Sequence, residues 1–264
     1  MITSQDFPAL VSTLDAGTMH LSTLSEASPM SRVLYDLCGS DSELRFSPYC
    51  WRVKLALAHK GLDVETRAWH FTDKQALAFA NYDKVPVLVD GDRTVVDSYE
   101  IMRYLDQAYP ETPSLLGDAT AEARVRYIKF HAERVMAPGI MRTIIMDLVN
   151  AIHPKDRDYF RETREKRFGC RLEEFHSPAR GLAQLDAALE PLRGLLDQTE
   201  FIDGDVPGAG DYLVFGNFMW ARSVSTADLI SNADPVHAWR ERMLDLHDGL
   251  GRQALRISDI EGSY

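Results

Sequence analysis

The segment SPYCWRVKLALAHKG, residues 47–61, decides the fold that this sequence predicts. Ser47 followed by Pro48 predicts the start of a helix, because a serine side chain can accept a hydrogen bond from a free backbone N–H and proline fits the first helical position. Trp51 and Leu55 follow at helical spacing, and the closing glycine ends the pattern. The free N–H groups and the positive dipole end of such a helix start can also stabilise an anion, such as a thiolate.

Apolar stretches on both sides of this helix predict strands, Arg32–Leu37 before it and Val64–Phe71 after it. A strand, a helix and a second strand form a crossover unit, which implies two parallel strands with the helix on one face of the sheet. We therefore expect the fold to open with a βαβ unit.

A hairpin and a further helix complete this part of the chain. Val85–Val89 and Thr94–Val96 flank Asp90-Gly91, a strong tight-turn signal between antiparallel strands. Asp97-Ser98 then provides the cap of a helix. With a short helical stretch at Asp73–Phe79, the predicted order of elements is βαβαββα.

The second part of the chain is predicted to be entirely helical, because long stretches with a period near 3.6 replace the strand signals. The expected helices are Ala119–Met136, Gly139–Ile152, Asp156–Glu174, Gly181–Leu196, Gly208–Ala221 and Pro235–Asp248. Pro138, Pro154 and Pro178 predict breaks between separate helices. We place the domain boundary near residue 112 and interpret the alternating charges of 156–174 as a solvated helix face.

Composition excludes several classes of protein. The chain has 264 residues, 29 Lys and Arg against 40 Asp and Glu, and a formal net charge of −11. This is the wrong sign for binding nucleic acid or an anionic membrane surface, and we expect neither as a partner. The three cysteines, Cys38, Cys50 and Cys170, cannot pair evenly and lack metal-ligand spacing, so neither a disulfide framework nor a metal site is expected.

The first thirty residues differ from the rest. Residues 1–31 contain ten Ser or Thr, three acids and no Lys or Arg, which predicts a flexible N-terminal arm over 1–30. Neither a secretory signal nor a transit peptide fits, so we expect a cytoplasmic protein.

Three motifs, in order, resemble the cytosolic glutathione S-transferases. They are SPYCWRVKLAL from Ser47, KVPVLVDG from Lys84 and DSYEIMRYL from Asp97. A further stretch, FIDGDVPGAGDY from Phe201, is similar to the segment that enters the family's buried helix, and Asp211 there can accept from the Gly208 N–H. The resemblance implies an α/β thioredoxin-like N-terminal domain over 31–112 and an all-α C-terminal domain over 113–264.

The resemblance also implies a site for glutathione as co-substrate, without a metal. Ser47 would hold the glutathione sulfur as the catalytic residue. Val85, before a cis Pro86, would pair with the cysteinyl backbone, and Lys84 would contact one end of the peptide. Asp97 and Ser98 would hold the γ-glutamyl end. Because the protein is acidic overall, we expect binding to depend on these local donors.

The helical half shows a similarity to the β-etherase branch of the family, through Asp158–Arg161, Arg164–Gly169, Arg142 and Leu246–Arg252. This suggests attack of the glutathione thiolate on an electrophilic aromatic or apolar molecule, including β-aryl ether cleavage. By their placement, five residues are candidates for the acceptor pocket: Tyr127, His131, Met141, Arg142 and Trp220. The family also implies a homodimer.

Two alternative functions stay open. The chain could be a non-catalytic glutathione-binding or interaction module. It could also be a glutathione-dependent disulfide or dehydroascorbate reductase, because Ser47-Pro-Tyr-Cys50 is a glutaredoxin-type motif with its first cysteine replaced. A dithiol cycle needs both cysteines, and we expect Cys50 to be a buried, inert thiol and Tyr35 to have a packing role.

Overall fold

The computed structural model describes residues 32–260, so the predicted arm over 1–30 lies outside the described residues. The described chain forms one four-stranded sheet, from β1 (Arg32–Leu37), β2 (Glu65–Trp69), β3 (Val87–Asp90) and β4 (Arg93–Val96), in the order β2-β1-β3-β4. β1 is parallel to β2 and antiparallel to β3, which in turn pairs with β4 through the predicted turn. The predicted strands and their pairing are confirmed.

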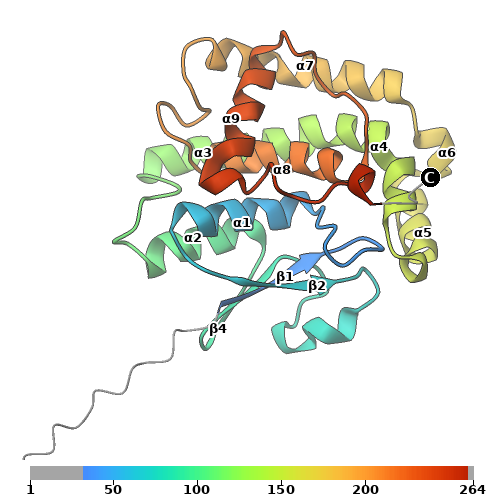
Figure 1. Ribbon diagram of the computed structural model, residues 1–264, viewed down its shortest axis with the longest axis horizontal. Helices are drawn as coiled ribbons and strands as arrows, with labels where there is room; N and C mark the ends of the chain where they lie inside the picture. The colour runs from blue at the N-terminus through green and yellow to red at the C-terminus, as the bar shows by residue number, and fades with distance from the viewer. Residues whose placement is uncertain (1–31, 261–264) are drawn as a thin grey trace, which may run out of the picture. The chain divides into compact units, whose positions relative to one another are not determined.

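Three helical segments accompany the sheet: α1 (Pro48–His59), the 3₁₀ helix η1 (Lys74–Ala80) and α2 (Ser98–Ala108). α1 and α2 lie between the sheet and the remaining helices, whereas η1 lies on the opposite side of the strands (Figure 1). Ser47 is the N-cap of α1 with proline in its first turn, as its sequence predicts. This is the thioredoxin-like half of the predicted fold.

The rest of the described chain contains helices and no strand. They are α3 (Ala119–His131), the π-helical segment η2 (Ala132–Met136), α4 (Ala137–Ala151), η3 (Pro154–Asp156), α5 (Arg157–Phe168), α6 (Leu172–Phe175), α7 (Pro178–Leu196), α8 (Ala209–Val224), α9 (Pro235–Gly249) and η4 (Ile257–Asp259). Among the described residues, no helix is long and apolar enough to cross a membrane.

The break predicted at Pro138 was wrong. α3, η2 and α4 follow one another without a gap, and Pro138 lies in the first turn of α4. Proline has no N–H to donate to the carbonyl four residues earlier, and a π-helical segment immediately before it allows the helix to continue around this missing bond. The proline therefore changes the helical pitch and does not end the helix.

The single helix predicted over 156–174 was also wrong, because the structure divides it into η3, α5 and α6. Gly169 ends α5 with a left-handed φ of +72°, a conformation that glycine adopts without steric cost. The direction of the chain therefore changes at Gly169.

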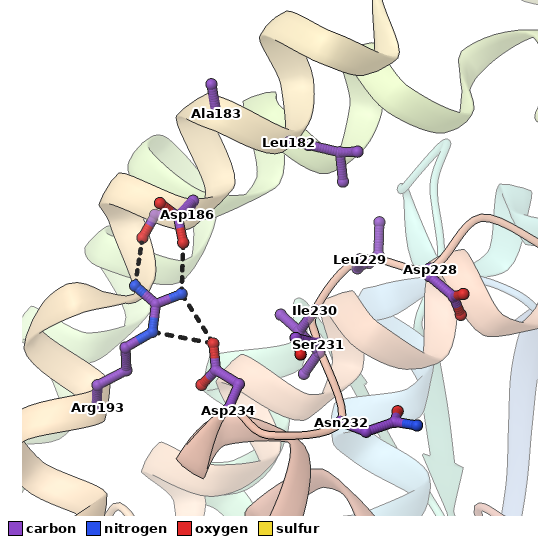
Figure 2. Close-up of a pocket in the computed structure, with 10 residues that line it drawn as sticks. All are labelled: Leu182, Ala183, Asp186, Arg193, Asp228, Leu229, Ile230, Ser231, Asn232 and Asp234. Carbon is purple, nitrogen blue, oxygen red and sulfur yellow. Dashed lines mark hydrogen bonds and ion pairs between the residues drawn. The ribbon is translucent and has the colours of Figure 1, made fainter.

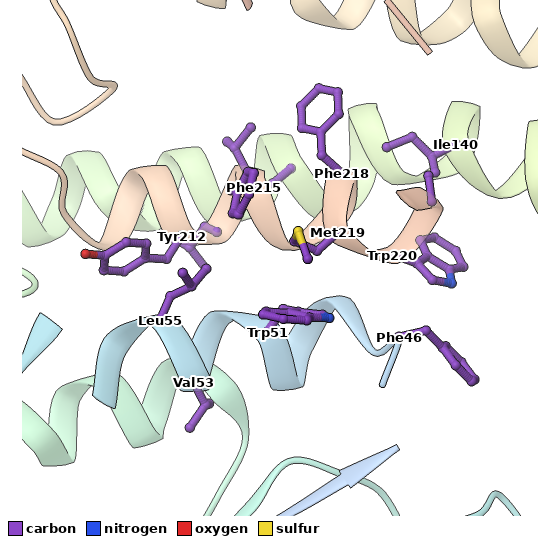
Figure 3. Packing of buried hydrophobic residues seen from close by; sticks show 14 of the residues in the cluster. Phe46, Trp51, Val53, Leu55, Ile140, Tyr212, Phe215, Phe218, Met219 and Trp220 are labelled. Carbon is purple, nitrogen blue, oxygen red and sulfur yellow. The ribbon is translucent and has the colours of Figure 1, made fainter. Parts of the chain in front are cut away.

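Helix α8 is the centre of the hydrophobic core. Every residue from Ala209 to Val224 is buried except Arg222, which is partly buried. Figure 3 shows Tyr212 and Met219 of α8 facing Trp51 and Leu55 of α1. Since α1 also covers the sheet, burial of these side chains joins the two halves of the described chain.

Gly216 allows α8 to approach the start of α1 closely. A Cβ atom at this position would overlap the carbonyl oxygen of Pro48 and would lie 3.1 Å from Cγ of Arg52. The glycine therefore fixes the distance between the core helix and the turn that carries Ser47.

The start of α8 is held by Asp211, as its spacing from Gly208 predicts. Its carboxylate accepts from the Gly208 N–H at 3.0 Å, from the Ile202 N–H at 2.8 Å and from Trp239 Nε1 at 2.8 Å. Burial raises the pKa of this carboxyl to about 6 although these donors oppose the shift. Asp211 thus joins three segments of the helical half.

Candidate functional site

A cavity of about 480 Å³ lies between the start of α1 and the helices α4 and α5. From the sheet half it is lined by Ser47, Tyr49, Lys84 and Val85, among others. The opposite wall comes from η2, α4, α5, α6, α7 and α8. The cavity therefore lies between a helix start and a largely aromatic helical wall, which is a common arrangement of a small-molecule site.

Ser47 lies at the boundary of this cavity with its side chain fixed. It is 3% exposed, and its Oγ accepts a hydrogen bond from the Cys50 N–H at 3.2 Å. α1 has no acidic residue in its first turn, so nothing there neutralises the positive end of its dipole. A sulfur placed beside Ser47 would meet a hydroxyl and this partial positive charge.

The peptide bond between Val85 and Pro86 is cis, and Val85 lines the same cavity. Pairing of Val87 with Val96 brings Pro86 and Asp97 to the same end of the β3–β4 hairpin. The start of α2 therefore lies beside the cis bond, although Asp97 and Ser98 are not among the residues that line the cavity.

Asp97 has an uncommon backbone conformation, with φ +69° and ψ 131°. Its carboxylate accepts from the Tyr99 N–H at 2.9 Å and from the Glu100 N–H at 3.3 Å, which caps α2 and holds this conformation in place. This backbone conformation costs free energy in a residue other than glycine. Such conformations occur often at binding and active sites.

Ser98, the next residue, is 1% exposed, and its hydroxyl has no hydrogen-bond partner among the described residues. A buried hydroxyl without a partner costs free energy, and natural proteins rarely keep one. At the start of a helix it could contact a ligand carboxylate.

Aromatic rings form much of the cavity wall. The lining rings are Tyr49, Trp69, Phe71, Tyr159, Phe160, Phe168, Phe175 and Trp220. Phe168 and Phe175 stack with their centroids 3.9 Å apart and their planes at 7°. Such a wall can bury an aromatic ligand.

The cavity is basic although the chain is acidic. Its charged lining residues are Lys74, Lys84, Arg142, Arg164, Arg167 and one acid, Glu133. The acid is already paired, with Arg52 at 2.7 Å and Lys129 at 3.0 Å. The local field therefore favours an anionic ligand, in contrast to the expectation from net charge alone.

Three of the five residues predicted for the acceptor pocket, Met141, Arg142 and Trp220, line this cavity. Tyr127 and His131 do not. Tyr127 is 72% exposed, and His131 Nε2 lies 2.8 Å from the carbonyl oxygen of Ala188 on α7. No residue of α3 lines the cavity, whereas η2 and α4, which continue the same helix, do. Tyr127 and His131 both belong to α3 and therefore lie before the part of the helix that lines the cavity.

Two of the three cysteines, Cys38 and Cys50, are buried free thiols. Cys50 is fully buried, and burial raises the pKa of its thiol well above the ordinary value. Cys38 is also buried, and its pKa is raised to about 11 for the same reason.

Tyr35 does not line the cavity and contacts the ring of Phe79 at 5.6 Å between centroids. Among residues 32–260, no group of three or more His, Cys, Asp or Glu could hold a metal ion.

Sequence reasoning missed the contribution of α5. Its charged residues were interpreted as a solvated face, yet Tyr159, Phe160, Arg164, Arg167 and Phe168 line the cavity. The sequence did contain a signal for this contribution. Phe160, Arg164 and Phe168 are spaced by four residues, so they share one face of the helix. Arg161, which does not line the cavity, pairs with Glu165 at 2.9 Å.

A second cavity of about 580 Å³ lies between α7 and the segment before α9. Figure 2 shows Arg193 of α7 between two carboxylates, at 2.6 Å from Asp186 and 2.8 Å from Asp234. These ion pairs raise the pKa of the guanidinium and connect α7 to the start of α9. Three of its four charged groups bind one another, and we assign this cavity no function.

Comparison with protein families covers most of the described chain. Residues 42–113 match the model of the glutathione S-transferase N-terminal domain, and residues 126–248 match that of the glutathione S-transferase C-terminal domain.

Curated relatives of higher identity match over part of the chain. The probable glutathione S-transferase GSTU1 of Oryza sativa subsp. indica is 37% identical over 97 residues, which are 34% of this chain and 42% of that protein. Glutathione S-transferase 1 of Dianthus caryophyllus is 33% identical over 115 residues, 41% of this chain and 50% of that protein. The chain spans about half the length of the curated relatives it matches.

Solved structures match over both halves. Glutathione transferase GSTFuA2 from Phanerochaete chrysosporium aligns with a TM-score of 0.68 at 26% identity, covering 85% of this chain and 95% of that one. The glutathione S-transferase CsGST63524 of Ceriporiopsis subvermispora, solved in complex with glutathione, aligns with a TM-score of 0.71 at 22% identity, covering 83% and 96%. The fold predicted from the sequence is therefore confirmed.

Proposed function

Because the chain belongs to the cytosolic glutathione S-transferase family, we propose that it binds glutathione in the cavity at the start of α1 and transfers it to an electrophilic aromatic molecule. One observation carries this proposal. Ser47, Lys84 and Val85 line a single cavity whose opposite wall is aromatic. The glutathione complex solved for the relative of Ceriporiopsis subvermispora supports the assignment of the ligand.

Each part of glutathione has a partner in this proposal. The sulfur lies at Ser47, the cysteinyl backbone pairs with Val85, and Lys84 contacts a carboxylate. The γ-glutamyl carboxylate takes the free hydroxyl of Ser98 and the helix start behind it, while Asp97 contacts the ammonium. This accounts for a buried hydroxyl that has no partner among the described residues.

The chemistry is activation of a thiol. A free thiol with a pKa near 8.5 is only a few per cent thiolate at pH 7, so lowering that pKa by about two units makes the nucleophile dominant. The Ser47 hydroxyl and the dipole of α1 favour the thiolate. The thiolate attacks an electrophilic carbon, a carbon–sulfur bond forms, and the leaving group departs with the bonding electrons.

Calorimetry with glutathione, followed by conjugation to 1-chloro-2,4-dinitrobenzene, tests this function. We expect binding at millimolar glutathione or below and enzyme-dependent formation of the thioether. Binding without turnover of any aryl halide or ether would favour a non-catalytic glutathione-binding module. A mixed disulfide between Cys50 and glutathione would instead favour the reductase, which the buried thiol argues against.

A finer version of the proposal is glutathione-dependent cleavage of β-aryl ethers, in which a phenolate is the leaving group. The stacked pair Phe168–Phe175 and the lining tryptophans support it, because they offer surfaces for two aryl groups. Release of a fluorescent phenol from a β-aryl ether with glutathione present tests it. Turnover of halides with no release of phenol would restrict the protein to conjugation.

We also propose a cytoplasmic homodimer, on the strength of the family. Tyr127 and Phe130 are 72% and 44% exposed and lie three residues apart on α3, so one helix face offers apolar surface for a second copy. Sedimentation of the wild type and of Tyr127→Glu tests this. A monomeric wild type would contradict the proposal.

A further inference from the structure

Three arginines on the helical wall of the cavity lack an acidic partner among the described residues; Arg167 is exposed, whereas Arg142 and Arg164 are partly buried. Arg142 of α4 donates from Nη1 to the Phe175 carbonyl oxygen at 3.1 Å, and its guanidinium lies 4.4 Å from the centre of the Phe175 ring. Its Nε is buried and has no hydrogen-bond partner among the described residues. Nothing in the described part of the chain forms an ion pair with it.

Arg164 of α5 is in a similar position. Among the described residues, the one hydrogen bond of its side chain runs from Nη1 to Thr163 Oγ1 at 2.9 Å, and its guanidinium lies 4.5 Å from the centre of the Phe160 ring. Burial lowers the pKa of this group. By contrast, Arg161 on the same helix pairs with Glu165 and with Glu173, each at 2.9 Å.

A charge that is partly removed from water without a counter-ion costs free energy, and an anionic ligand would offset this cost. Arginine is suited to this purpose, because its planar guanidinium binds carboxylates in a two-bond geometry and stacks on aromatic rings. At both arginines, a ring that could contact an aryl group lies beside the cation.

Glutathione does not account for these two cations in the proposed binding mode. Its two carboxylates have partners on the sheet half, at Ser98 and at Lys84. Arg142 and Arg164 belong to the opposite wall, which faces the acceptor.

We propose that Arg142 and Arg164 select an aromatic acceptor that carries an anionic group, of the carboxylate or phenolate class. This inference rests on the proposed function, because it assigns the half of the cavity that glutathione leaves free. The aryl group packs against Phe160 and Phe175, and its anionic substituent binds the two guanidinium groups.

The test compares two conjugates that differ in one substituent, S-(4-carboxybenzyl)glutathione and S-(4-carbamoylbenzyl)glutathione. Calorimetry gives the Kd of each for the wild type and for Arg142→Gln and Arg164→Gln. We expect the wild type to bind the carboxylate at least about tenfold more tightly than the carboxamide, since hydrogen bonds to charged groups contribute that much or more. The ratio of the carboxamide Kd to the carboxylate Kd should be severalfold closer to one in each variant than in the wild type.

Arg157→Gln is the matched control, because it removes one positive charge from an exposed residue at the start of α5 that does not line the cavity. It should keep the wild-type ratio. A wild-type ratio at or below one overturns the proposal even if neither cavity variant folds. A high ratio that both variants retain, or a loss of glutathione affinity with the ratio unchanged, overturns it as well.

The proposed function can fail separately. If glutathione binds and the carboxylate gives no advantage, the function stands and this inference is wrong. If neither glutathione nor either conjugate binds, both are wrong.

Discussion

The hydroxyl oxygen of Ser47 accepts a hydrogen bond from the backbone N–H of Cys50 at 3.2 Å. The position that would carry the attacking sulfur of a dithiol pair therefore holds a capping hydroxyl. Cys50, the sulfur in the same turn, is fully buried, and its pKa is raised by burial. In the proposed function, the thiolate that reacts at this helix start therefore comes from bound glutathione.

Ser98→Ala should separate binding from stability. The hydroxyl is buried without a partner, so its removal should leave the free energy of unfolding unchanged or raise it by up to about 1 kcal/mol. Glutathione affinity should fall about tenfold or more, as a carboxylate contact is lost. Thermal unfolding and calorimetry measure the two effects.

Ser223→Ala is the matched control for Ser98, because this serine is also buried but donates to the carbonyl oxygens of Met219 at 2.9 Å and Arg45 at 3.2 Å. It should lose about 1 kcal/mol of stability and keep its glutathione affinity. Unchanged affinity in the Ser98 variant would remove Ser98 from the site.

Gly216→Ala should destabilise the protein by about 1 to 3 kcal/mol, because the added methyl group overlaps the Pro48 carbonyl and forces α8 away from the start of α1. Urea unfolding gives the change. Gly194→Ala on α7 provides the comparison, since a Cβ there meets nothing within 4 Å and the change should stabilise by up to about 1 kcal/mol. Equal effects of the two substitutions would contradict the close approach.

The residues His59, Tyr212 and His247 make stability depend on pH. Tyr212 OH lies 2.8 Å from His59 Nδ1 and 3.2 Å from His247 Nε2, and burial lowers the pKa of both imidazoles. In the unfolded chain these groups bind protons more readily. Their contribution to stability is therefore present above about pH 6.5 and is lost as the pH falls from there through the folded pKa values.

Between pH 7.5 and pH 5.5 the stability of the wild type should accordingly change less favourably than that of the double variant His59→Gln, His247→Gln, while Asp211, whose pKa is raised to about 6, contributes with the opposite sign in both proteins. Urea titrations at both pH values measure this, and the comparison cancels the groups that both proteins share. A double variant with an unchanged pH dependence would show that these histidines do not titrate with folding.

Asp156 attaches the helical half to the sheet half. Its buried carboxylate accepts from the N–H groups of Phe71 at 2.9 Å and Thr72 at 3.1 Å and from the Thr72 hydroxyl at 2.6 Å. Asp156→Ala should cost about 3 kcal/mol or more, because three donors lose a charged acceptor. Asp158→Ala, on the exposed face of α5, should stay within about 0.5 kcal/mol of wild type. A loss below about 1 kcal/mol at Asp156 would contradict this role.

Local signals allowed the fold to be predicted. Ser47-Pro48, Asp90-Gly91 and the Gly208–Asp211 spacing act through neighbouring backbone groups, and each has its expected structure. Pro138 was misinterpreted because its effect depends on whether the preceding turn can widen to π-helical geometry. That adjustment belongs to the packed helix and leaves no local signal in the sequence.

The glutathione half of the candidate site could be predicted because its residues belong to contiguous motifs. The acceptor half could not, because α4 and α5 converge only in the folded chain. Arg164 appeared as one charge in a mixed run, and its position beside Phe160 without an acidic partner distinguishes it from Arg161, which pairs with Glu165. Tyr127 and His131 were chosen by sequence position, which does not indicate where along a helix the cavity begins.

The pKa of the bound glutathione thiol tests the central claim most directly. Thiolate absorbance near 240 nm, titrated against pH for wild type, Ser47→Ala and Ser47→Thr saturated with glutathione, measures it. We predict a pKa about two units below that of free glutathione in the wild type, a similar value in the threonine variant, and one close to free glutathione in the alanine variant. A wild-type value equal to that of free glutathione, or an alanine variant that lowers it equally, would contradict the account.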